Sequence, residues 1–294
     1  MGDGQLRLTK HHGAGNDFLV LLDPDGRRPL SGGEVRALCD RHRGVGADGV
    51  LRATSSTVPG AALAMELRNA DGSVAEMSGN GIRCFVQAAV VAGLVTPGRV
   101  TVATAAGVRT VQYRPGAEPG LAHAEVDMGR AVLGAVVDVG DVPGARAARL
   151  VDMGNPHVVV LGEPVDDATV SRAGPRLATS HPDGANVEFA WPGPDAGDLS
   201  LRVWERGVGE TLACGTGACA VVAAARAWAS AGNRVRVHSR GGTVEVTLSD
   251  EGILLSGPTR LVGTVTVDES VLAAMVDDRR AANLDRDDEV VVRP

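Results

Sequence analysis

Ser78-Gly79-Asn80-Gly81-Ile82-Arg83-Cys84 and Cys214-Gly215-Thr216-Gly217-Ala218-Cys219 are two similar stretches that begin 136 residues apart. In each, a nucleophile-type side chain precedes a Gly-x-Gly turn. Each turn leads into an almost wholly apolar run, residues 85–92 and 220–227, which predicts a buried helix. The sequence therefore predicts two similar halves. If the halves face each other, two acid/base side chains and two sets of helix N–H groups converge on one small anion.

Short β-type segments bounded by Gly, Pro, Asn and Asp make up most of the remaining chain. Further helices are predicted only at residues 33–41, after Ser31, and at about 268–283. Many strands around one buried helix per half indicate an α+β fold. We expect residues 1–120 to form the N-terminal half, 121–268 the C-terminal half and 269–294 a polar tail. Whether the tail packs on the N-terminal half stays open. The segment 116–120 is the expected linker, with a crossing point a few residues later as the alternative.

Composition narrows the class of protein. The chain has 294 residues, a net charge of −7 and no Lys/Arg run, which argues against nucleic acid as a partner. No apolar run reaches the roughly 18 residues of a membrane span, and no signal peptide begins the chain, so we expect a cytoplasmic protein without a membrane partner. Four irregularly spaced cysteines suggest a reduced compartment, with thiol chemistry or plain packing.

Two common kinds of site are not indicated. Gly44-Val45-Gly46-Ala47-Asp48-Gly49 matches the dinucleotide fingerprint, but it follows a helix-like segment and opens no helix, so a Gly-rich loop is the better interpretation. His11 and His12 are adjacent, and Cys214 and Cys219 lack a second pair at metal-ligand spacing. The sequence therefore predicts no metal site.

Cys214 stands at the predicted start of a helix, where the dipole and N–H groups favour the thiolate and are expected to lower its pKa towards neutrality. A thiol so placed can act as a base. The N–H groups of Gly79, Asn80, Gly215 and Thr216 can hold a carboxylate between the two turns. A single cysteine here would more often be a packed small residue, but the doubled motif favours catalysis.

Small polar clusters surround these turns in the sequence. They are Gly15-Asn16-Asp17, Arg68-Asn69-Ala70-Asp71-Gly72, Gly154-Asn155-Pro156-His157, Asn186 and Trp204-Glu205-Arg206-Gly207. A ring of Asn amides can grip the ammonium and carboxylate of an amino acid together. We expect Arg206 to bind a distal carboxylate, and Glu205 to take an ammonium or to orient His157. The alternative for Glu205 and Arg206 is a surface ion pair.

Together these residues resemble the diaminopimelate epimerase family. The resemblance extends over residues 8–267 and is carried, in the family's order and spacing, by Lys10 to Phe18, Asn69-Ala70-Asp71-Gly72-Ser73, Ser78-Gly79-Asn80-Gly81, Gly154-Asn155-Pro156-His157, Asn186-Val187 and Glu205-Arg206-Gly207 through Cys214-Gly215-Thr216-Gly217.

The resemblance implies an isomerase of the lysine and peptidoglycan-precursor pathway, which interconverts LL- and meso-2,6-diaminopimelate without a cofactor. It implies two pseudo-symmetric halves, each a curved, mostly antiparallel, barrel-like sheet around a central helix, with the active site in the cleft between them. It also implies a homodimer and a small-molecule substrate. Family members move the α-proton with two cysteines on opposite faces of the carbon.

Carried over by motif position, the resemblance assigns a role to each residue. The substrate is contacted by Asn16, Asn69, Asn155 and Asn186, and its distal stereocentre lies at Glu205 and Arg206. The reacting carboxylate is bound by Gly79, Asn80, Gly215 and Thr216. His157 supports the site, Cys214 is one acid/base, and Ser78 stands in the place of the other.

Ser78 is a departure, because the family has a cysteine there and a serine hydroxyl is far less acidic than a thiol. Cys84 is no replacement, since it lies about 9 Å further along the helix and on another side. Three explanations of this serine stay open. Ser78 works with help from a neighbouring group or water, it is an engineered change that lets the protein hold substrate without turnover, or the chain has moved to another reaction. Two further alternatives stay open: another isomerase or racemase of the same fold acting on a different amino acid, and a catalytically disabled amino-acid-binding protein.

Overall fold

Both buried helices begin one residue after the side chain that opens each motif. In this computed structural model, which describes residues 4–288, α2 spans Gly79–Val91 and α4 spans Gly215–Ala227. Ser78 and Cys214 are the N-caps: Ser78 Oγ accepts a hydrogen bond from the Gly81 N–H at 2.9 Å, and Cys214 Sγ accepts one from the Gly217 N–H at 3.4 Å. The first part of each apolar run, residues 85–89 and 220–225, is buried as the sequence predicted, whereas residues 91–92 and 226–227 are exposed.

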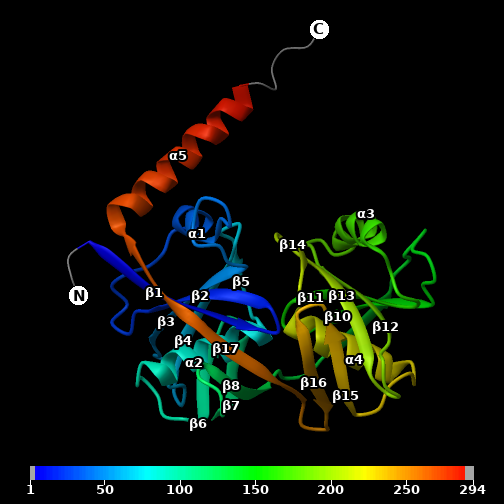
Figure 1. Cartoon of the computed structure of the whole chain (residues 1–294). Coiled ribbons are helices and arrows are strands. Elements are labelled where there is room, and N and C mark those ends of the chain that lie inside the picture. The colour runs from blue at the N-terminus through cyan, green and yellow to red at the C-terminus, as the bar shows by residue number, and fades with distance from the viewer. Residues whose placement is uncertain (1–3, 289–294) are drawn as a thin grey trace.

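The strands form one continuous, mostly antiparallel sheet that folds into two bodies lying side by side (Figure 1). Around α2 lie β1 (Gln5–Gly13), β2 (Asn16–Leu22), β3 (Gly49–Ser55), β4 (Leu63–Asn69), β5 (Val74–Ala75), β6 (Gly98–Thr104), β7 (Gly107–Pro115) and β8 (Leu121–Asp127). Around α4 lie β9 (Val132–Val136), β10 (Ala147–Asp152), β11 (Pro156–Leu161), β12 (Asn186–Pro192), β13 (Leu199–Glu205), β14 (Gly209–Thr211), β15 (Arg234–Ser239) and β16 (Gly242–Leu248). β17 (Ile253–Asp268) runs from the second body into the first, pairing with β16, β8 and β1 in turn.

The two bodies repeat one topology. β2 pairs in parallel with β3 across helix α1 (Gly32–Cys39), and β11 pairs in parallel with β12 across helix α3 (Asp167–Ala178). Likewise β4 pairs in parallel with β6 across α2, and β13 pairs in parallel with β15 across α4. The predicted α+β class and the pseudo-symmetry are confirmed.

Helix α3 was missed by the sequence analysis. Gly174 and Pro175 interrupt its pattern, although Val170, Ala173 and Leu177 are buried at helical spacing and Asp166 caps its start. The repeat itself was the overlooked signal, because α3 is the counterpart of α1. Helix α1 follows the Ser31 cap as predicted.

The segment 116–120, expected to link the halves, is instead the turn of the β7–β8 hairpin, closed by a hydrogen bond from the Gly116 N–H to the Leu121 carbonyl. The division into residues 1–120 and 121–268 stays a proposal. In space, β8 and the C-terminal part of β17 lie with the first body.

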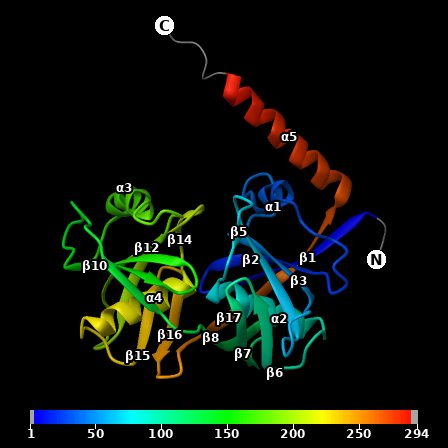
Figure 2. The same cartoon turned by 180° about the vertical axis from the view of Figure 1, so that it is seen from behind.

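Helix α5 (Glu269–Asp288) leaves the body beside α1 (Figures 1 and 2). Its first turns pack on the N-terminal half, because Leu272 is buried in a cluster with Val35 and Leu38 of α1, and Arg279 pairs with Asp40. Residues 289–294 of the predicted tail lie outside the described residues. Within residues 4–288, no helix is both long enough and apolar enough to span a membrane.

Candidate active site

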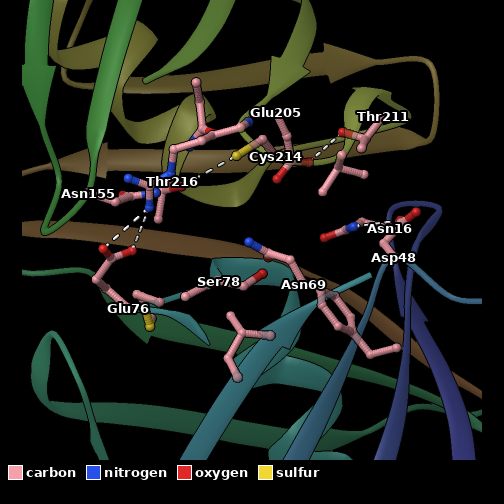
Figure 3. A pocket seen from close by; sticks show the side chains of 17 residues that line it. Asn16, Asp48, Asn69, Glu76, Ser78, Asn155, Glu205, Thr211, Cys214 and Thr216 are labelled. Atoms are coloured by element: carbon pink, nitrogen blue, oxygen red, sulfur yellow. Dashed lines mark hydrogen bonds and ion pairs between the residues drawn. The ribbon is translucent and has the colours of Figure 1, made fainter. Parts of the chain in front are cut away.

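One pocket between the two bodies collects most of the predicted site residues (Figure 3). Those that line it are Asn16, Asn69, Ser78, Asn155, Asn186, Glu205, Arg206, Cys214 and Thr216. Three polar residues that the sequence analysis did not assign to the site line it as well, namely Asp48, Glu76 and Thr211. Ser78 and Glu76 come from the N-terminal body, and Cys214 and Glu205 face them from the C-terminal body. The loops that looked like ordinary turns in the sequence therefore meet at one place.

The starts of α2 and α4 touch each other behind the pocket. A Cβ atom on Gly215 would lie 2.9 Å from the Asn80 nitrogen and from the Gly79 Cα, so only a glycine fits there. Asn80, fully buried, ties the two starts together, because its Nδ2 lies 3.3 Å from the Ala213 carbonyl oxygen and 3.3 Å from Asn16 Oδ1. The N–H ends of both helices are thus adjacent, but of the four residues expected to bind the carboxylate only Thr216 lines the pocket, and Gly79, Asn80 and Gly215 lie behind it.

Cys214 has an environment opposite to the one expected. Its side chain is buried, and burial raises the pKa of the thiol well above its usual value, with the negative charges of Glu205 and Glu188 adding to the effect. Hydrogen bonds from Thr216 and from the Gly217 N–H oppose these causes without outweighing them. The prediction of a lowered pKa is wrong, because the helix start acts against both desolvation and two neighbouring carboxyl groups.

Glu205 is partly buried. Burial raises its pKa to about 8, the hydrogen bond from the Thr211 hydroxyl acts in the opposite direction, and the charges of Asp48 and Glu188 raise it further. The surroundings of Glu205 therefore work against its charged form and against an ion pair with an ammonium group.

His157 is oriented by Glu188, not by Glu205 as one alternative held. Its Nδ1 lies 2.7 Å from Glu188 Oε1 and its Nε2 lies 3.0 Å from Asn155 Oδ1, and both His157 and Glu188 are fully buried. Through these contacts His157 fixes Asn155, which lines the pocket. A glutamate inside the apolar strand β12 was the signal in the sequence that this partner existed.

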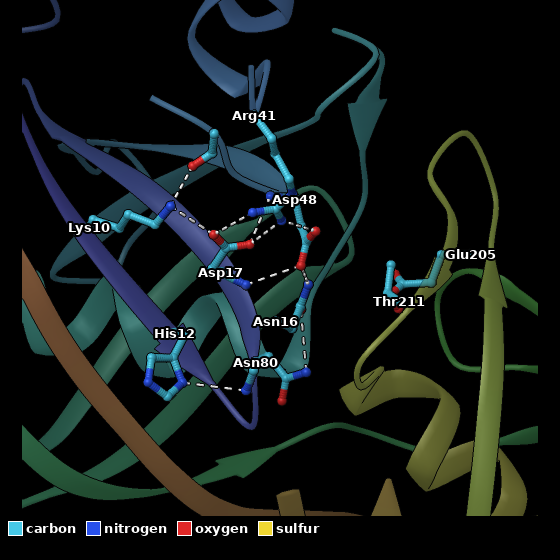
Figure 4. Close-up of polar contacts among 11 residues, drawn as sticks. Lys10, His12, Asn16, Asp17, Arg41, Asp48, Asn80, Glu205 and Thr211 are labelled. Atoms are coloured by element: carbon cyan, nitrogen blue, oxygen red, sulfur yellow. Dashed lines mark hydrogen bonds and ion pairs between the residues drawn. The ribbon is translucent and has the colours of Figure 1, made fainter. Parts of the chain in front are cut away.

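Asp48 fixes Asn16 in the other body (Figure 4). Asp48 Oδ2 accepts hydrogen bonds from Asn16 Nδ2 at 2.7 Å and from the Asp17 N–H at 3.1 Å, and Arg41 Nη2 lies 2.8 Å from Asp48 Oδ1. Because a carboxylate only accepts hydrogen bonds, the amide nitrogen of Asn16 must face Asp48. Burial and the nearby charge of Asp17 raise the pKa of Asp48.

Arg206 forms an ion pair, but with Glu76 and not with the adjacent Glu205. Arg206 Nη2 lies 3.0 Å from Glu76 Oε2 and 3.3 Å from Oε1, and Nη1 donates to the Asp183 carbonyl oxygen at 3.1 Å. The backbone N–H of Arg206 donates to Asn186 Oδ1 at 2.9 Å. The pair joins the two bodies at the pocket, so a surface pair of Glu205 with Arg206 is excluded.

The other cysteines lie outside the pocket. Cys84 and Cys219 are fully buried, and burial raises their thiol pKa values to about 11 and about 12. Cys84 accepts a hydrogen bond from the Thr259 hydroxyl at 3.5 Å and cannot take the place of Ser78. Over the part of the chain that the structure describes, no three His, Cys, Asp or Glu side chains gather in an arrangement for a metal ion.

The fold is that of racemases and epimerases. A hydroxyproline epimerase from Agrobacterium vitis, solved with bound trans-4-hydroxy-L-proline, superposes with a TM-score of 0.73 and 18% identity, covering 91% of this chain and 93% of that one. A phenazine biosynthesis protein from Bacillus anthracis superposes with a TM-score of 0.66 and 17% identity, covering 90% of this chain and 99% of that one. At such identities the likeness concerns the fold alone.

The chain belongs to the diaminopimelate epimerase family, whose model matches residues 8–134 and 149–262. The diaminopimelate epimerase of Mycolicibacterium paratuberculosis is 42% identical over 288 residues, which cover 90% of this chain and 97% of that protein. The enzyme of the same name from Corynebacterium glutamicum is 40% identical over 274 residues, covering 87% of this chain and 96% of that protein. The family resemblance recognised in the sequence is confirmed.

Proposed function

We propose that this protein interconverts LL- and meso-2,6-diaminopimelate by moving a proton between the two faces of one α-carbon. The observation that carries the proposal is that Ser78 and Cys214, the N-caps of two touching helices, line the same pocket from opposite bodies. Cys214 serves one face of the carbon and Ser78 stands at the other.

The reacting carboxylate binds between the helix starts, to the N–H groups of Gly79, Asn80, Gly215 and Thr216. An α-proton is weakly acidic, so its removal requires stabilisation of the developing negative charge, which fixed N–H groups in a buried site supply. Around them Asn16, Asn69, Asn155 and Asn186 contact the substrate, with His157 supporting Asn155. Glu205 and Arg206 lie at the distal stereocentre.

The position of Lys10 supports proton transfer without pyridoxal phosphate. That cofactor is held by a lysine, and Lys10 is the only lysine in the sequence. Its ammonium group lies 2.9 Å from Asp17 Oδ2 and donates to the Gly46 carbonyl oxygen at 2.5 Å, outside the pocket that Ser78 and Cys214 line.

We further propose a cytoplasmic location, since the cysteines suggest a reduced compartment, and a homodimer, which the family resemblance implies. Sedimentation velocity at two protein concentrations tests the dimer, for which a single species of twice the chain mass is expected.

The test of the reaction is proton NMR of LL- and meso-diaminopimelate in D2O with three proteins: the chain itself, Ser78→Cys and Cys214→Ser. We expect exchange and epimerisation with the chain itself, faster turnover with Ser78→Cys, and none with Cys214→Ser. Activity only in Ser78→Cys would make this chain a form that binds substrate without turning it over. If the chain itself and Ser78→Cys are both folded and both inactive, the epimerase assignment is overturned, and another substrate or a binding protein is favoured.

A further inference from the structure

Glu76 lies at the pocket beside Arg206 and has no role in the function proposed above. We propose that Glu76 accepts the distal ammonium group of the substrate while Arg206 binds the distal carboxylate, so that Glu76 makes the site selective for a diamino diacid. This inference rests on the proposed function and names the residue that reads one end of its substrate.

Three carboxyl groups line the pocket, and two of them are already committed. Asp48 accepts hydrogen bonds from Asn16, the Asp17 N–H and Arg41. Glu205 is partly buried and accepts a hydrogen bond from Thr211, and its surroundings raise the pKa of its carboxyl group to about 8. Of the three carboxyl groups, Glu76 is therefore the one left to accept an ammonium group.

Glu76 is placed for that contact. Its side chain is 41% exposed, and the hydrogen bonds that it accepts from described residues all come from Arg206 Nη2. The carboxylate can thus receive an additional cation without leaving Arg206.

Arg206 has capacity for a second carboxylate. A guanidinium carries five N–H donors, and its hydrogen bonds to described residues involve Nη2 with Glu76 and Nη1 with Asp183, so Nε makes none of them. Glu76 and Arg206 together present a negative and a positive group side by side. That arrangement is complementary to the ammonium and carboxylate borne on a single α-carbon.

The spacing along the chain agrees with the length of the substrate. Glu76 precedes Ser78 by two residues, so their Cα atoms are at most about 7 Å apart. The two stereocentres of 2,6-diaminopimelate are separated by four carbon–carbon bonds, about 5 Å when extended. With one stereocentre at Ser78, the other falls within reach of Glu76.

The test measures the affinity for meso-diaminopimelate and for L-2-aminopimelate, which lacks the distal amino group, by calorimetry. For Glu76→Gln we expect affinity for diaminopimelate to fall about 10-fold or more, and affinity for 2-aminopimelate to change less than about 2-fold. Glu118→Gln is the matched control, because Glu118 also pairs with an arginine, Arg260 at 2.8 Å, but lies on the β7–β8 turn away from the pocket.

Equal losses for both ligands would show that Glu76 only holds Arg206 in place, and no loss for either would show that the pair has no part in recognition. Both results overturn the inference and leave the proposed function intact. If the unaltered protein binds neither ligand, the proposed function itself fails. Thermal denaturation of each variant confirms that it is folded.

Discussion

Gly215 of α4 lies directly against Gly79 of α2, so closely that a Cβ on Gly215 would come within 2.9 Å of the Gly79 Cα. The neighbouring atoms are backbone, which cannot move aside as a flexible side chain can. The two helix starts can therefore lie in direct contact only because Gly215 has no side chain.

Gly215→Ala is expected to force the helix starts apart. Overpacking of this kind costs about 1–3 kcal/mol of unfolding free energy, and the displaced N–H groups should lower kcat/KM at least 10-fold. Urea denaturation and turnover of diaminopimelate measure the two effects. Gly263→Ala is the control, because a Cβ there meets no atom within 4 Å. An unchanged kcat/KM in Gly215→Ala would contradict the importance of the contact.

Asp48→Asn is expected to raise KM about 10- to 100-fold, because an amide has one acceptor oxygen where the carboxylate uses two, and so cannot serve both Asn16 Nδ2 and Arg41 Nη2. Steady-state kinetics with diaminopimelate test this, and circular dichroism checks the fold. Asp25→Asn serves as the control, since Asp25 is 65% exposed in a loose pair with Arg27. A fall in stability with unchanged KM would reduce Asp48 to a structural role.

The features that the sequence predicted well are local ones. A capping side chain, a Gly-x-Gly turn and an apolar run are enough to place α2 and α4, because each signal lies within one turn of the next. The contacts that sequence analysis missed join distant residues: Asn16 with Asp48, 32 residues apart, and Glu76 with Arg206, 130 residues apart. The pKa of Cys214 was predicted wrongly for the same reason, because the helix start is local whereas Glu205 and Glu188 come from other strands.

Glu188→Gln is expected to lower the pKa of the Cys214 thiol, because it removes one of the negative charges that disfavour the thiolate. The pH at which Cys214 begins to react with a small alkylating reagent should therefore fall. Mass spectrometry separates Cys214 from Cys84 and Cys219, which are enclosed in the core and provide the internal comparison. If the pH dependence of Cys214 stays where it is, Glu188 does not act on the thiol through its charge.

Glu205→Gln is expected to change how stability depends on pH. Burial raises the pKa of Glu205 from 4.5 to about 8, so between these values the folded protein binds a proton that the unfolded chain has lost. Stability from this group is thus fully present below about pH 4.5 and is lost as the pH rises through about 8. Between pH 5 and pH 9 the loss is on the order of 4 kcal/mol.

The glutamine variant keeps a similar shape but cannot ionise, so its unfolding free energy should fall less between pH 5 and pH 9 than that of the unaltered protein. Urea denaturation at pH 5, 7 and 9 measures the difference, and subtracting the two curves removes the groups they share. Glu251→Gln, at an exposed turn, should leave the pH dependence unchanged. Parallel curves for the unaltered protein and Glu205→Gln would mean that Glu205 is ionised in the folded protein, and the elimination that leaves Glu76 as the ammonium acceptor would lose one of its two steps.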